Sequence, residues 1–291
     1  MGKETARYWG RGNHLERYGI LIYVAGVALS MTLVAVLISS CVHTLPVHSQ
    51  SMPSSPTNVA VETEIHDFAL HGNARPALIV HNSIGFLHVR SDRDRHNMHI
   101  MVVKTVGSSG DAPDNIKVNY SQSDNVLTIL VVHTQTNLFA VNDARADIDV
   151  VLPAQSDLQL QTGTGSIEVA NIEGTMSLRS GTGTIRATGI SLMGNSQLRT
   201  NMGGVSFQGS IHDGSYQFQS VTGNVDVTLP PGSCFHTDIR STLGFFSSDF
   251  PGIVEKPMLV GARASGDIGA HPSAVVVLVS NTGAISLRRA K

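Results

Sequence analysis

The segment LQLQTGTGSIEV, residues 158–169, decides how this chain folds because close variants of it recur along the sequence. The variants are MSLRSGTGTIRA at 176–187, SQLRTNMGGVSF at 196–207, YQFQSVTGNVDV at 216–227, TDIRSTLGFF from 237, VVLVSNTGAISL at 276–287 and, earlier, LIVHNSIGFLHV at 78–89. Each reads apolar-x-apolar-x-[Ser/Thr/Asn]-x-x-Gly-x-apolar-x-apolar. Such a pattern is typical of a repeat fold, in which each unit buries its apolar face against its neighbours.

The glycine of each unit sets the period. It stands at Gly85, Gly165, Gly183, Gly203, Gly223, Gly244 and Gly283. From Gly165 to Gly244 the steps are 18, 20, 20 and 21 residues, and the 39 residues from Gly244 to Gly283 are close to two further steps. Apolar residues alternate on both sides of the glycine, which predicts two short strands that meet at a glycine corner. A further apolar residue after the second strand, such as Ile190 or Leu229, predicts a third short face.

The chain is therefore predicted to be all-β, a single-stranded β-helix or solenoid of roughly 20-residue coils over residues 62–291. Hydroxyls three residues before the glycine are expected to bond the backbone and to be structural; they belong to Thr162, Ser180, Thr200 and Ser220. The part from 62 to 150 is less regular and is interpreted as first coils or a cap. Within it, 116–132 alternates like a hairpin and 104–115 has a loop composition.

An uncharged run, GILIYVAGVALSMTLVAVLISSCV at 19–42, is long enough to cross a bilayer as a helix. Lys and Arg residues precede it and none follows until Arg75, so the positive-inside rule predicts a cytoplasmic tail at 1–18 and an extracytoplasmic C-terminal domain. Residues 43–61, rich in Pro and Ser, predict a flexible stalk. The sequence Ile38-Ser39-Ser40-Cys41 also resembles a lipobox, in which Cys41 would be lipidated, but the length of the run favours an uncleaved anchor.

Composition excludes several classes of function. The net charge is -2, with 20 basic and 22 acidic residues mostly scattered, which argues against nucleic-acid binding. Two cysteines exclude a disulfide scaffold. Among the 13 histidines, His81, His88, His96 and His99 are the best metal candidates, but their spacing does not match a closed zinc site and a surface role is favoured.

No Ser/His/Asp arrangement can be singled out, and the sequence contains no G-x-S-x-G, H-E-x-x-H or G-x-x-x-x-G-K-[ST] motif. The outward acids Asp149, Glu168, Asp226 and Asp267 are expected to fall at different coil positions without forming a row, so solvated surface charge is favoured over catalysis. The chain is expected to be no enzyme and to bind no cofactor or metal.

Two further features have ordinary structural interpretations. Cys234 is expected to be a lone thiol without function. Phe245, Phe246 and Phe250 are expected to pack in the core, with an exposed contact patch as the alternative.

The T-x-x-G-x-I-x-V units, the segments VTLPPG and VVLPAQS and the N-terminal anchor resemble the DUF4097 putative-adhesin family of bacterial envelope proteins. The resemblance covers about residues 60–291, which excludes the anchor. The resemblance implies an extracytoplasmic β-solenoid with a role in adhesion or in the envelope-stress response, and it implies no catalytic residues.

Two functions are therefore considered. In the first, the solenoid side binds envelope polysaccharide, cells or a surface protein through ladders of outward residues, such as Gln159, Arg179, Arg199 and Gln217. In the second, the chain senses envelope stress and acts through a membrane or cytoplasmic partner of its tail. Both place it in the cell membrane as a single-pass protein.

Overall fold

The structure is a computed structural model, and it describes residues 59–291 apart from 73, 93–94, 108–114, 134–143 and 257. The predicted tail, the anchor with Cys41 and all but the last three residues of the predicted stalk lie outside the described residues. Within the part of the chain that is described, no helix has the length and apolarity needed to cross a membrane.

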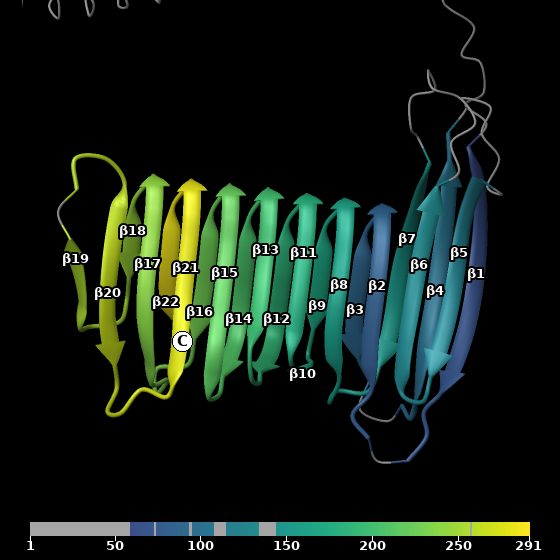
Figure 1. The fold of residues 1–291 in the computed structure, drawn as a ribbon, viewed down its shortest axis with the longest axis horizontal. Coiled ribbons are helices and arrows are strands. Elements are labelled where there is room, and N and C mark those ends of the chain that lie inside the picture. The colour runs from purple at the N-terminus through teal and green to yellow at the C-terminus, as the bar shows by residue number, and fades with distance from the viewer. Residues whose placement is uncertain (1–58, 73, 93–94, 108–114, 134–143, 257) are drawn as a thin grey trace, which may run out of the picture. The chain divides into compact units, whose positions relative to one another are not determined.

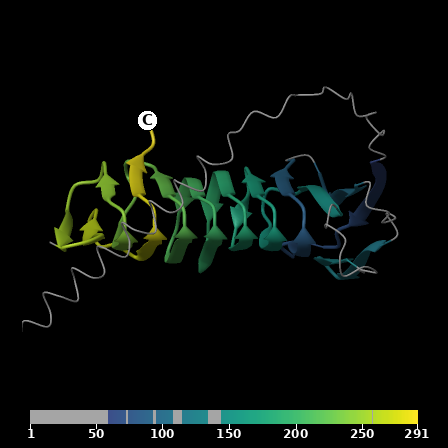
Figure 2. The ribbon, with the colours of Figure 1, turned by 90° about the horizontal axis from the view of Figure 1, so that it is seen from above.

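The described residues form two open sheets that lie face to face (Figures 1 and 2). Sheet A runs, in spatial order, through β1 (Ala60–Ala69), β4 (Asn97–Val106), β7 (Arg145–Leu152), β3 (Leu87–Ser91), β9 (Ile167–Ala170), β12 (Ile185–Leu192), β14 (Val205–Ile211), β16 (Val225–Leu229), β22 (Ile285–Arg289) and β18 (Phe246–Ser248), with β10 (Glu173–Gly174) paired to β12. Sheet B runs through β19 (Ile253–Lys256), β20 (Ala262–Ile268), β17 (Phe235–Leu243), β21 (Ala274–Thr282), β15 (Gly214–Thr222), β13 (Ser196–Met202), β11 (Met176–Thr182), β8 (Asp157–Thr164), β2 (Ala77–Ile84), β6 (Val126–His133) and β5 (Ile116–Ser123). The predicted all-β class is confirmed for the residues that the structure describes.

Successive repeats stack in parallel, and each gives one strand to sheet B and one to sheet A. In sheet B, Leu178 is level with Leu160 on one side and Leu198 on the other. The predicted third face is wrong, because Ile190 and Leu229 remain within β12 and β16. Strand β12 continues past a register shift at Thr188/Ile190, since its backbone still pairs with β14 beyond that point. Each coil therefore has two main faces.

The last repeat is inserted out of sequence order. Strand β21 lies between β15 and β17, with Val276 level with Tyr216 on one side and Thr237 on the other. Strand β22 lies in the same way between β16 and β18. The chain thus leaves a gap after β16, forms β17 to β20, and returns to fill the gap (Figure 1).

The first repeat is also out of order. Strands β2 and β3 pair directly with β8 and β9, and β6 and β7 form the next coil outward. Antiparallel strands close this end: β1 pairs with β4, and β5 with β6. The predicted hairpin at 116–132 is confirmed, with Asp124 at φ 52 in its turn. The predicted loop at 104–115 begins later than expected, because β4 extends to Val106.

One continuous core lies between the sheets. Inward side chains alternate along every central strand, as in β13, where Leu198 is fully buried and Arg199 is exposed. Aromatic residues contribute to this core, where the ring centroids of Phe207 and Phe218 lie 5.1 Å apart. Because each unit shares this core with its neighbours, no coil buries its apolar row alone.

A ladder of hydrogen bonds follows the glycine corner. The Thr200 hydroxyl donates to the carbonyl of Gly183 (2.8 Å), and that of Ser180 to Gly165 (2.9 Å). The same bond links Thr162, Ser220, Ser280 and Ser241 to Gly85, Gly203, Gly223 and Gly283. At Gly183 φ is +149°, and an added Cβ would lie 2.1 Å from the Gly165 carbonyl oxygen. The corner therefore needs glycine, and the predicted backbone bonding of these hydroxyls is confirmed.

Candidate functional site

The outer face of sheet B from β8 to β15 carries two parallel rows of polar side chains. The lower row is Gln159, Ser177, Gln197 and Gln217, and the upper row is Gln161, Arg179, Arg199 and Gln219. The four ladder residues expected from the sequence therefore share this face but not one row: Gln159 and Gln217 lie two residues before the level of Arg179 and Arg199. A step of two residues keeps a side chain on the same face of a strand. We call this surface the polar face.

Residues of the polar face bond to one another, within the lower row and between the rows, and the lower row borders two shallow hollows. The Gln197 side-chain amide donates to the Ser177 hydroxyl (3.1 Å), and that of Gln217 donates to Gln219 (3.3 Å). One hollow, of about 220 Å³, is lined by Gln159 and Ser177 among others, and the next, of about 280 Å³, by Gln197 and Gln217. Both include Asn195, so the hollows are neighbours.

The two central arginines of the upper row have no internal partner. Arg179 and Arg199 are exposed and aligned on adjacent parallel strands, and neither guanidinium has an ion pair or hydrogen bond to another described residue. Arg240, in the same row on β17, differs because its guanidinium binds the Asp238 carboxylate at 2.5 Å. That hydrogen bond lowers the pKa of Asp238. The polar face thus presents two free positive charges.

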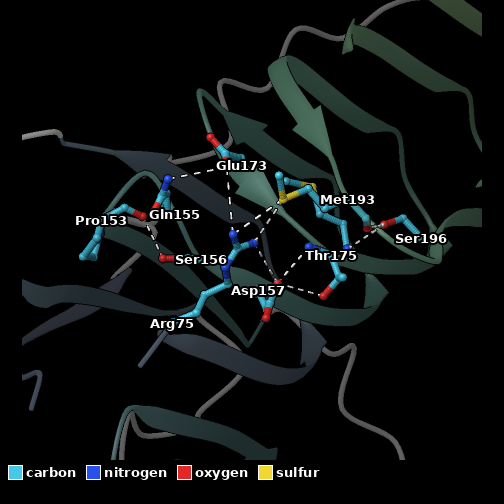
Figure 3. A network of polar contacts seen from close by, with 10 residues as sticks. Arg75, Pro153, Gln155, Ser156, Asp157, Glu173, Thr175, Met193 and Ser196 are labelled. Atoms are coloured by element: carbon cyan, nitrogen blue, oxygen red, sulfur yellow. Dashed lines mark hydrogen bonds and ion pairs between the residues drawn. The ribbon is translucent and has the colours of Figure 1, made fainter. Parts of the chain in front are cut away.

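The carboxylate nearest to the polar face is already bound. Asp157 Oδ1 accepts hydrogen bonds from the backbone N–H (2.8 Å) and hydroxyl (2.9 Å) of Thr175, and it lies 3.7 Å from Arg75 (Figure 3). The Arg75 guanidinium also lies 3.9 Å from Glu173 and 3.5 Å from the Met193 sulfur. This network fastens the segment before β2 to the coils that follow, so its role is structural.

Sheet A carries a larger polar groove, whose charges are matched internally. The groove has a volume of about 850 Å³ and is lined by Arg90, Asp92, Arg95, Asn171, Glu173 and Ser191, among others. Arg90 lies 3.6 Å from Asp149, and Arg95 lies 3.5 Å from Asp92 and 3.9 Å from Asp67. Its two arginines therefore already face carboxylates.

The expected scatter of outward acids is wrong for three of the four. Asp149, Glu168 and Asp226 share one outward row of sheet A, because β7, β3, β9, β12, β14 and β16 are paired in register. His88 separates Asp149 from Glu168, and it lies 2.8 Å from Asp149. Asp267 lies on sheet B, 2.5 Å from His236. In this row, therefore, no two carboxylates lie on adjacent strands.

The histidines singled out as metal candidates lie apart. His81 is on the outer face of sheet B, level with Gln161, whereas His88 is on sheet A. His99 pairs with Asp67 at 2.9 Å. Across the described ranges, no group of three His, Cys, Asp or Glu side chains is arranged to hold a metal ion.

The remaining singled-out residues lie at the β17–β20 end. Cys234 is an exposed free thiol. Phe250 is 4% exposed and packs edge-on against Phe235 at 5.4 Å, as expected for the core, while Phe246 is partly buried. Phe245 differs because it is 75% exposed.

One cluster was not found from the sequence. Inside the β1 end of the stack, Lys104 is 6% exposed and its ammonium binds the Glu64 carboxylate, with Glu62 at 3.5 Å. The Tyr120 hydroxyl donates to Glu64 (3.0 Å), and burial raises the pKa of that phenol. Burial lowers the pKa of Lys104, but the hydrogen bond and charge of Glu64 outweigh it and the pKa is raised. The available signal was the alternation Glu62, Glu64, His66 in a strand whose other face, with Val61 and Ile65, is exposed.

Comparison with known proteins gives a likeness of structure alone. No protein-family model and no curated protein matches the chain. A solved structure described as a "putative cell adhesion protein" of Clostridium sporogenes has a TM-score of 0.46 and 13% identity, covering 79% of this chain and 100% of that one. A "putative adhesin" of Bacteroides fragilis has a TM-score of 0.32 and 11% identity, covering 78% and 97%. A "putative lipid binding protein" of Parabacteroides distasonis has a TM-score of 0.32 and 10% identity, covering 81% and 98%. Membership of the DUF4097 family therefore stays a prediction.

Proposed function

We propose that the chain is a non-enzymatic, adhesin-like surface protein, held in the membrane by residues 19–42, that binds an envelope polymer through the polar face. The observation that carries this proposal is the pair of in-register rows on β8, β11, β13 and β15. Parallel strands lie about 4.8 Å apart, so each row repeats similar hydrogen-bonding groups at a constant spacing.

A surface that repeats the same hydrogen-bonding groups at a constant spacing suits a polymer built of repeated units. A polymer lying across the strands would meet amides or hydroxyls at every step, and Gln, Ser and Arg side chains are donors that match sugar hydroxyls and acidic groups. The hollows beside Asn195 offer adjoining places for bulky units of such a chain. The polar face supports a binding role better than the groove on sheet A, because the arginines of that groove already face carboxylates.

The test is direct binding. Full chain in zwitterionic detergent is labelled and titrated against whole cells, isolated envelope polysaccharide and inert beads. The proposal predicts saturable binding to the polysaccharide that unlabelled polymer competes away. Binding at bead level in every arm would contradict it, and would favour the alternative role in envelope-stress sensing. In that role, substitutions at Arg7, Arg11 or Arg17 of the tail should alter the response.

A further inference from the structure

We infer that the polymer is an anionic one, and that Arg179 and Arg199 each bind one of its acidic groups. The inference rests on the proposed function of the polar face and adds the chemical class of the ligand. Its starting point is that the two guanidinium groups belong to level residues of neighbouring parallel strands.

Two like charges at this spacing repel each other unless something neutralises them. Strand spacing places the two residues about 4.8 Å apart, and like charges directly opposite on a sheet are unfavourable. On the four described sheet B strands β8, β11, β13 and β15, the only outward carboxylate is that of Asp157 at the start of β8, which is held by Thr175 and Arg75. The counter-charge for Arg179 and Arg199 is therefore missing from the polar face itself.

The same row shows how the fold neutralises an arginine when no ligand is required. The Arg240 guanidinium donates two hydrogen bonds to the carboxylate two residues before it, at 3.3 and 2.5 Å to the oxygens of Asp238. The equivalent position is Ser177 before Arg179 and Gln197 before Arg199. Both replacements are neutral, and they bond to each other at 3.1 Å. An internal carboxylate is thus structurally possible in this row but absent at the central pair.

The neighbours of the pair suit an anionic chain. Gln161 and Gln219 flank the arginines in the upper row, and their amides donate hydrogen bonds without adding charge. Guanidinium groups bind carboxylate and phosphate through paired N–H donors. The ligand chemistry is therefore a linear polymer with an acidic group on successive units, either a carboxylated polysaccharide or a phosphate-linked polymer.

The experiment measures binding of full chain in zwitterionic detergent to fluorescent polygalacturonate, polyphosphate and neutral dextran by anisotropy. The double variant Arg179→Gln/Arg199→Gln continues the glutamine row already present at Gln161 and Gln219, so the fold should tolerate it. The matched control is Arg240→Gln, which removes an arginine of the same row that is already paired. A third variant, Gln197→Asp, supplies Arg199 with the carboxylate that Arg240 has.

We expect saturable binding to at least one acidic polymer that weakens with added salt, and the preferred polymer identifies carboxylate or phosphate as the source. Losing a charged hydrogen bond costs about tenfold or more in affinity, so Arg179→Gln/Arg199→Gln should lose at least that factor. Gln197→Asp should weaken binding, and Arg240→Gln should stay within about twofold of wild type, a change of a few tenths of a kcal/mol.

Equal loss with Arg240→Gln, or no loss with the double variant, would overturn the inference. Binding to dextran that is insensitive to the double variant would also overturn it, while leaving the proposed function intact. Background binding to all three polymers and to isolated envelope polysaccharide would contradict both. Circular dichroism of each variant establishes that its strand content is unchanged.

Discussion

Replacing the corner glycine Gly183 with alanine should destabilise the stack strongly. The new Cβ would lie 2.1 Å from the Gly165 carbonyl oxygen and 2.5 Å from its carbonyl carbon. Both atoms are backbone atoms of the preceding coil, so the clash can be relieved only by moving one coil relative to the other. The backbone at Gly183 has φ +149°, a conformation that alanine adopts with strain.

The magnitude follows from two costs and one gain. Strained φ costs about 1–3 kcal/mol and overpacking about 1–3 kcal/mol, while alanine lowers the entropy of the unfolded chain by about 0.4–1 kcal/mol. We expect Gly183→Ala to lower the free energy of unfolding by about 2–4 kcal/mol. The assay is urea denaturation of the full chain in mild detergent, followed by far-ultraviolet circular dichroism.

The matched control is Gly232→Ala, where no heavy atom lies within 4 Å of the added Cβ. This variant should stay within about 0.5 kcal/mol of wild type. If Gly183→Ala were as stable as Gly232→Ala, the reasoning that close stacking of carbonyls requires glycine at the corner would be refuted.

Three further predictions concern the corner, the capped end and the inserted repeat. Thr200→Val removes the hydroxyl that donates to Gly183 at 2.8 Å and should cost about 1–2 kcal/mol in the same denaturation assay; an unchanged midpoint would contradict this. Burial raises the pKa of Glu64, but its hydrogen bonds to Lys104 and Tyr120 outweigh burial and the pKa is lowered. The ionised carboxylate therefore stabilises the folded state above its unfolded pKa, and this stabilisation is lost as pH falls through the lowered folded value. Lys104→Met should flatten this acid-side decline, and identical pH profiles would count against the ion pair. Cysteines replacing Gln217 and Val277, level on β15 and β21, should be joined by a short thiol crosslinker, whereas a stack in sequence order would leave them unjoined.

The sequence was sufficient for the coils because the repeat encodes them locally. Alternation around Gly165 or Gly203 specifies two strands and a corner without reference to distant residues. The order of the coils is different, because any two repeats with the same pattern can pair. Nothing in VVLVSNTGAISL distinguishes a place on the far side of β17 from a place between β15 and β17. In the structure β20 occupies the far side, and β21 lies between β15 and β17.

The candidate site was predictable in kind but not in register. The sequence identified outward Gln and Arg residues, yet combined members of two rows, because a shift of two residues preserves the face and is invisible to an alternation pattern. The absence of partners for Arg179 and Arg199 depends on which strands adjoin them, which the pairing of β8, β11, β13 and β15 supplies. The cluster at Lys104 was missed because charged residues that point inward at the end of the stack give the same sequence pattern as charged residues on an exposed strand.

We propose that the polar face of sheet B, rather than sheet A, contacts the polymer. This proposal is tested most directly by single cysteines at two exposed glutamines on opposite sheets, Gln159→Cys on β8 and Gln208→Cys on β14, each coupled to a bulky maleimide after Cys41 and Cys234 are replaced by serine. We expect the label at 159 to abolish binding to isolated envelope polysaccharide and the label at 208 to leave it unchanged. Blocked binding at 208 with normal binding at 159 would contradict it.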